Sequence, residues 1–120
     1  MIKFLRDLSQ TKVFDVYKTS MPILGVDGSL SFVNEFEKNI DLKGAKGNVF
    51  AKTGTYIKVD DNGSVVIGAQ AFAGYIDAKS GRRLVYGLYV NNVPTENPIN
   101  DVGQIFQDEG TISAIIWKEN

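Results

Sequence analysis

Residues 48–91 read NVFAKTGTYIKVDDNGSVVIGAQAFAGYIDAKSGRRLVYGLYVN, and this stretch has the periodicity of β-strands. From Val49 towards Val59 the side chains alternate with a two-residue rhythm. Turn signals at residues 60–63 (DDNG) and 77–81 (DAKSG) divide the stretch into three strands, and Asn-Gly is favoured in hairpins. Because short turns join antiparallel neighbours, the pattern predicts a three-stranded meander.

The middle strand, residues 65–76, is apolar almost throughout, which indicates burial on both faces and a central position in the sheet. Helices are expected before and after the strands in the sequence. Residues 2 to about 10 carry apolar side chains at helical spacing, and so do residues 98–118. Gly110 leaves open a break in the second of these helices, because glycine costs about 1 kcal/mol relative to alanine in a helix interior.

The segment before the first strand is expected to contain a loop and a further helix. Residues 11–28 form the loop, in which Pro22, Gly25 and Gly28 permit tight turns. The helix is expected to begin at Ser29 or Ser31 and to end near Gly44. Its predicted apolar face consists of Phe32, Val33, Phe36 and Ile40.

These elements predict an α+β fold in which helices pack on a three-stranded antiparallel sheet. With 120 residues, the chain has the size of a single domain with one core. We divide it into residues 1–47 (helices and the VDGS loop, residues 26–29), 48–91 (the sheet with the KTG sequence) and 98–118 (the C-terminal helix).

The composition excludes several kinds of function. Thirteen Lys and Arg residues against 14 Asp and Glu residues give a net charge of -1, which does not favour a nucleic acid or an anionic membrane as partner. The chain has no Cys and no His, which excludes a thiolate nucleophile, a Ser-His-Asp triad and His or Cys metal ligands. We expect no cofactor and no metal. Asp60, Asp61 and Asn62 lack the spacing of a calcium loop, so a hairpin turn is the simpler interpretation.

We do not expect the N-terminal residues to form an export signal. Arg6 and Asp7 interrupt the region that is apolar in a signal peptide, and no later run is long and apolar enough to span a bilayer. We therefore expect a soluble chain that does not insert into a membrane.

Residues 51–55, Ala-Lys-Thr-Gly-Thr, form the sharpest candidate site. On an edge strand that lines a cleft, Lys52 would supply a cation and Thr53 a hydroxyl group for a substrate carboxylate. Gly54 would leave room for a ligand beside the backbone, and the N–H of Thr55 would point at a developing oxyanion. The alternative is a strand whose lysine protects the sheet edge against aggregation.

Four segments in order give the chain a resemblance to a known family: residues 21–30 (MPILGVDGSL), 51–55 (AKTGT), 73–76 (AGYI) and 81–84 (GRRL). Together they resemble the C-terminal part of penicillin-binding D-alanyl-D-alanine carboxypeptidases of the DacB type, members of the serine β-lactamase superfamily. The resemblance covers residues 2 to 118. It implies the C-terminal portion of the β-lactamase and transpeptidase fold.

The resemblance also implies a chemistry, acyl transfer to a serine. In that family the serine of an S-x-x-K motif is the nucleophile. The lysine of that motif and an S-x-N motif take part in proton transfer, and K-T-G binds the substrate. By resemblance, Lys52, Thr53, Gly54 and Thr55 would bind a peptidoglycan peptide ending in D-Ala-D-Ala, or a β-lactam. Family members work outside the cytoplasmic membrane, which implies that the parent protein is exported to the periplasm or cell wall.

The S-x-x-K and S-x-N motifs lie upstream of K-T-G in the family, whereas only 51 residues precede Lys52 here. Ser9-Gln10-Thr11-Lys12 spells S-x-x-K, but this pattern is frequent by chance and falls at a helix end. Tyr89-Val90-Asn91 spells a Y-x-N variant but follows K-T-G. We therefore assign no catalytic residue to this chain, reject Ser9 and Lys12, and expect a C-terminal fragment that is inactive alone.

Two other interpretations remain open. The chain would be a non-catalytic module that binds a carboxylate-bearing peptide, or a structural module that assembles through a strand edge. If the family fold applies, the strand from Leu84 to Val90 presents an unpaired apolar edge. That edge would recruit a second copy, giving a homo-oligomer, or the missing N-terminal part of the parent protein.

Overall fold

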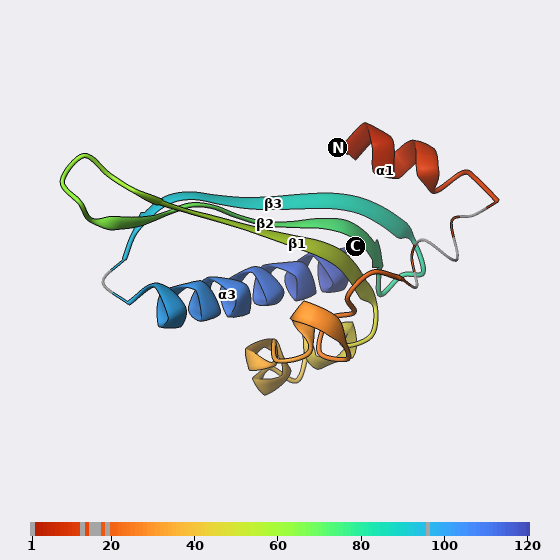
Figure 1. The fold of residues 1–120 in the computed structure, drawn as a ribbon. Coiled ribbons are helices and arrows are strands. Elements are labelled where there is room, and N and C mark those ends of the chain that lie inside the picture. Colours follow the sequence, from red (N-terminus) through yellow and green to blue (C-terminus); the bar gives the residue numbers. More distant parts are fainter. Residues whose placement is uncertain (1, 13, 15–17, 19, 96) are drawn as a thin grey trace.

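The computed structural model describes residues 2–12, 14, 18, 20–95 and 97–120. Three antiparallel strands form one sheet in the order β1-β2-β3, and a long helix packs along it (Figure 1). This arrangement confirms the predicted α+β fold. The elements are helix α1 (Ile2–Leu8), the short 3-10 helices η1 (Gly28–Leu30), η2 (Glu35–Lys38) and η3 (Lys43–Ala45), strands β1 (Val49–Val59), β2 (Val65–Asp77) and β3 (Arg83–Pro94), and helix α3 (Pro98–Glu119).

The hairpin between β1 and β2 is the longest projection of the sheet (Figure 1). Its strands pair from Val49 opposite Ile76 to Val59 opposite Val65, with a shift of register after Tyr56. At the tip, the Asp60 carboxylate accepts hydrogen bonds from the backbone N–H groups of residues 62 and 64, both at 2.9 Å. The Asp60 carboxylate therefore stabilises the hairpin turn.

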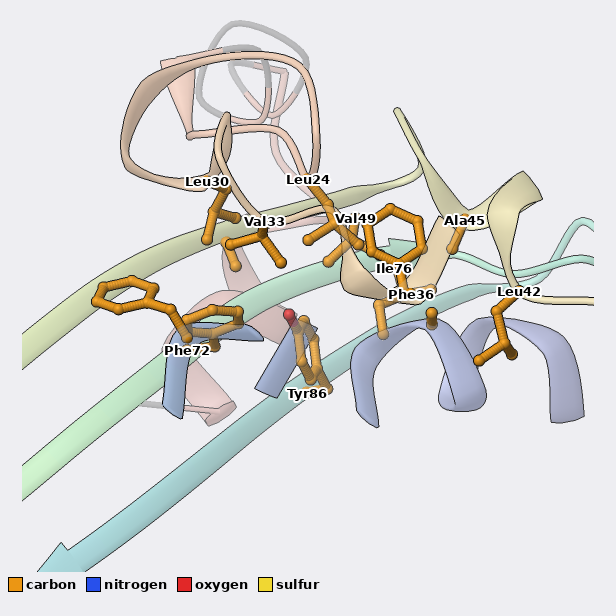
Figure 2. Close-up of a cluster of buried hydrophobic side chains, with 13 residues drawn as sticks. Leu24, Leu30, Val33, Phe36, Leu42, Ala45, Val49, Phe72, Ile76 and Tyr86 are labelled. Atoms are coloured by element: carbon orange, nitrogen blue, oxygen red, sulfur yellow. The ribbon is translucent and has the colours of Figure 1, made fainter. Parts of the chain in front are cut away.

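Side chains on the two faces of β2 belong to different apolar clusters, as expected for a central strand. Phe72 and Ile76 point to the face covered by α3, while Ala73 and Tyr75 point to the opposite face. Figure 2 shows the larger cluster, in which side chains from the segment before β1 meet those of the sheet and of α3. Its fully buried members include Leu24, Leu30, Val33, Phe36, Val49, Phe72 and Ile76.

Helix α1 covers part of the opposite face, where it contacts β2 and β3. Leu5 is buried there, and its carbonyl oxygen accepts a hydrogen bond of 2.6 Å from the Tyr75 hydroxyl group. Phe14 packs edge-to-face on the Tyr75 ring at 4.9 Å between centroids. The helix predicted for residues 2 to about 10 is confirmed and ends at Leu8.

The helix predicted between residue 29 or 31 and Gly44 is wrong: the structure has the three short 3-10 helices there. The cause is a side chain that is distant in sequence. Gln107 of α3 accepts hydrogen bonds from the backbone N–H groups of Asn34 (2.9 Å) and Glu35 (3.0 Å), and its amide donates to the carbonyl of Phe32 (2.9 Å). A continuous helix would pair the N–H of Glu35 and the carbonyl of Phe32 internally, and here both groups are bound to Gln107 instead.

Helix α3 runs without a break at Gly110, so the break that the sequence left open does not occur. The glycine serves close packing instead. A Cβ atom at this position would lie 2.2 Å from the Val33 side chain. The absence of that atom lets α3 approach the segment before β1, and this offsets the low helix propensity of glycine. Among the described residues, no helix is long and apolar enough to cross a membrane.

Candidate functional site

The site predicted from the sequence lies on β1, an edge strand of the sheet. Only the start of β1 pairs with another segment on its outer side among the described residues: Leu24 donates to Val49 and Ala51 donates to Pro22, each at 3.0 Å. Backbone groups of alternate residues point to the same side of a strand, so those of Thr53 and Thr55 face this outer side as well. We call residues 52–55 the KTGT edge.

Lys52 and Gly54 leave the KTGT edge accessible. The Lys52 side chain is exposed, and its ammonium group donates a hydrogen bond of 3.0 Å to the carbonyl of Thr53. The position that a Cβ atom of Gly54 would take is open, with no described atom within 4 Å. A positive charge therefore lies beside an unobstructed stretch of backbone.

The two threonine hydroxyl groups of the KTGT edge each contact a side chain from another segment. Thr53 Oγ1 lies 3.0 Å from Ser29 Oγ, and either atom can donate. Thr55 Oγ1 donates to Gln70 Oε1, on the neighbouring strand β2. Gln70 is completely buried, and its Nε2 has no partner in the described part of the chain.

The loop before β1 holds Ser29 in place. Asp27 Oδ1 accepts a hydrogen bond of 2.9 Å from the N–H of Ile23, and the N–H of Gly25 donates to the carbonyl of Leu30 at 3.0 Å. Gly28 has a φ of 60° and lies against Pro22, where a Cβ atom would come within 3.1 Å of the ring. The sequence located this loop but gave Asp27 no role, and the structure shows that Asp27 closes it.

Ser29 and Gln70 were missed as members of the site by the sequence analysis. Ser29 was considered as a helix cap, and its place after Val26-Asp27-Gly28 was the available signal. For Gln70 the signal was a polar residue inside the apolar run of β2. Neither signal identifies the partner, since each contact depends on how two segments are brought together.

Ser9 and the Tyr89–Asn91 segment are not brought to the KTGT edge, and Lys12 is an exposed residue in the turn after α1. Ser9 follows α1, whose contacts lie on the face opposite Thr53, and its hydroxyl group donates to the carbonyl of Arg6. Tyr89 and Asn91 lie within β3, separated from β1 by β2. The S-x-x-K pattern lies in the turn after α1, and the Y-x-N pattern lies within β3.

A cavity of about 630 Å³ lies away from this edge, between the end of β3 and the first turn of α3. Its lining is mostly polar and includes no residue of the KTGT edge. The lining residues are Ser64, Val65, Pro94, Thr95, Asn97, Asn100 and Asp101.

Glu109 is the described residue with the most unusual electrostatic environment. Its side chain is 1% exposed, neither carboxyl oxygen has a hydrogen-bond partner among the described residues, and burial raises its pKa from 4.5 to about 8. Burial likewise raises the pKa of Tyr86, whose hydroxyl group lies 3.1 Å from that of Ser113. This cluster lies between β3 and α3, within the core.

A known protein family matches most of the chain. The model of the D-Ala-D-Ala carboxypeptidase 3 (S13) family matches residues 1–109, which include α1, the VDGS loop, the whole sheet and the first half of α3. A search of curated proteins found no match. The family consists of peptidases that act on peptidoglycan, in agreement with the resemblance of the KTGT edge and the three other segments. Since the match spans most of its length, the chain belongs to the D-Ala-D-Ala carboxypeptidase 3 (S13) family.

Proposed function

We propose that this chain supplies the substrate-binding strand of a serine D-alanyl-D-alanine carboxypeptidase that hydrolyses peptidoglycan peptides by acyl transfer. One observation carries the proposal: the KTGT edge lies on the open side of an edge strand, with a lysine ammonium group and a threonine hydroxyl group beside accessible backbone. The family match supports the reaction class.

Each residue of the KTGT edge has a role in this proposal. Lys52 and Thr53 bind the terminal carboxylate of the peptide by a charge-assisted contact and a hydroxyl hydrogen bond. Gly54 lets the substrate approach the backbone, and the N–H of Thr55 stabilises the oxyanion that forms during acyl transfer. The same groups would hold the carboxylate of a β-lactam.

The serine nucleophile and the S-x-N motif are, in this proposal, supplied by sequence outside the 120 residues. Residues 1–47, 48–91 and 98–118 then form the C-terminal portion of an exported enzyme, and the chain alone does not react. Incubation with benzylpenicillin followed by intact-mass measurement tests this point. We expect no covalent adduct. An adduct that disappears in Ser9→Ala would show instead that Ser9 is a nucleophile.

Binding is tested separately from reaction. Acetyl-D-Ala-D-Ala should perturb the backbone amide NMR signals of residues 52–55, and the same dipeptide with a C-terminal amide should bind more weakly. Thr53→Val should remove this preference for the acid, while the matched control Thr11→Val, which alters an exposed threonine after α1, should keep it. Equal binding of acid and amide by the unaltered chain would refute the proposal.

Assembly through β3 is a second candidate, favoured by the position of β3 at the other edge of the sheet. An edge strand presents backbone groups that pair with a further strand from a second copy or from the rest of the enzyme. Sedimentation over a range of concentrations tests self-association. A monomer at high concentration would exclude the homo-oligomer and leave pairing with another part of the enzyme.

A further inference from the structure

We propose that Ser29 is a positioning residue for Thr53. Its hydroxyl group donates a hydrogen bond to Thr53 Oγ1, and this leaves the Thr53 proton free to point at the carboxylate of a bound peptide. The inference rests on the proposed function, since it assigns Ser29 to the same carboxylate site. It adds a residue from the VDGS loop, 24 positions before Thr53 in the chain.

The two hydroxyl groups hold two protons between them. Each hydroxyl group has one proton to donate, and the 3.0 Å contact between Ser29 and Thr53 uses one of the two. If Thr53 donated to Ser29, Thr53 would present only lone pairs to the outer side of β1, and these repel an anion. If Ser29 donates, Thr53 keeps its proton for the ligand and Ser29 oxygen remains free to accept from water.

The charge at the KTGT edge selects the second arrangement when a carboxylate is bound. The Lys52 ammonium group lies beside Thr53, bound to its carbonyl at 3.0 Å, so an anion is attracted to this position. The anion in turn favours the orientation in which the Thr53 proton points towards it. Ser29 then supplies the hydrogen bond that Thr53 oxygen accepts, which makes the Thr53 proton a better donor.

The loop geometry lets Ser29 act in this way without rearrangement. The Asp27 carboxylate closes the loop on the N–H of Ile23, and Leu30, the next residue after Ser29, is completely buried. Ser29 itself is exposed at the surface of the site. Because the folded loop already holds Ser29 beside Thr53, ligand binding orders little additional structure. The conformational entropy needed to orient Thr53 is therefore lost when the loop folds, before the ligand binds.

The test compares four variants for binding of acetyl-D-Ala-D-Ala and of its C-terminal amide, measured by NMR titration. Ser29→Ala should lower the affinity for the acid about three- to tenfold, the usual effect of one hydrogen bond, and leave the affinity for the amide nearly unchanged. Ser29→Thr should restore binding of the acid because it keeps the hydroxyl group. Ser31→Ala, a matched exposed serine in the same segment, should behave as the unaltered chain, and Thr53→Val should lose the preference for the acid.

The outcomes separate this inference from the proposed function. If Thr53→Val loses the preference and Ser29→Ala keeps it, Ser29 has no positioning role and the proposed function stands. An equal loss of acid and amide in Ser29→Ala, or a Ser29→Thr variant as weak as Ser29→Ala, also overturns the inference, because the effect would then be structural. No preference for the acid in the unaltered chain overturns both.

Discussion

Raising the pH should weaken the fold through Glu109, a carboxyl group buried between β3 and α3. Its pKa is raised from 4.5 to about 8 because burial disfavours the charged form. Between these values the unfolded chain has lost the proton and the folded chain keeps it. The folded state therefore binds more protons, and the free energy of unfolding falls as the pH rises. No histidine or cysteine side chain titrates in the same range.

The size of the effect follows from the two ionisation equilibria. A tenfold change in proton concentration is worth about 1.4 kcal/mol while only the folded state holds the proton. From about pH 5 to about pH 8 the loss is roughly 3 kcal/mol, a large part of the 5 to 15 kcal/mol expected for a domain. Urea unfolding at several pH values, followed by the fluorescence of the single tryptophan Trp117, measures it.

Two substitutions make the test specific. Glu109→Gln keeps the shape of the side chain but cannot ionise, so its stability should be flat over this range and should exceed that of the unaltered chain at high pH. Glu119→Gln removes an exposed carboxyl group and should preserve the slope. The reasoning is refuted if the stability difference between the unaltered chain and Glu109→Gln is the same at about pH 5 and about pH 8.

Three further substitutions test the packing, each by urea unfolding. Gly110→Ala should destabilise the fold by about 1 to 2 kcal/mol, because overpacking against Val33 exceeds the gain in helix propensity, and Val33→Ala in the same chain should reverse part of the loss. Gly74→Ala should cost more than about 3 kcal/mol, since its Cβ atom would lie 1.9 Å from a main-chain carbonyl oxygen of β1. Tyr75→Phe should cost about 1 kcal/mol and speed amide exchange in α1, because the carbonyl of Leu5 loses the buried Tyr75 hydroxyl group and keeps only the N–H of Ser9 as a donor.

The sheet could be predicted because its signals are local. Each strand has its own periodicity, and the turns at residues 60–63 and 77–81 connect neighbours directly. The segment 29–44 could not be predicted in the same way. Its apolar residues stand at helical spacing, yet Val33 and Phe36 are buried while Phe32 and Ile40 are 47% and 76% exposed. Backbone hydrogen bonds to the distant Gln107 determine its conformation, and no local pattern contains that information.

The candidate site likewise contains residues that could be located from the sequence and residues that could not. Lys52 to Thr55 could be located because the four residues are contiguous and belong to one strand. The partners of the two threonines lie on other segments, Ser29 on the loop and Gln70 on β2, and their contacts exist only once the sheet and the loop have come together. Glu109 was missed because a glutamate on a helix is ordinarily solvated, and only the packed structure shows that this one is buried.

The hydrogen bonds of Gln107 also determine which parts of the molecule open together. Residues 28–45 contain no helix longer than four residues, so their order depends on the docked α3. Gly44 makes a second contact between this segment and α3. It lies so close to the Trp117 ring that a Cβ atom would come within 2.6 Å of that ring. A fluctuation that lifts α3 from the sheet therefore releases this whole segment as one cooperative unit. Ser29 belongs to that unit, so its contact with Thr53 is expected to be lost whenever α3 undocks, while residues 52–55 keep their pairing with β2.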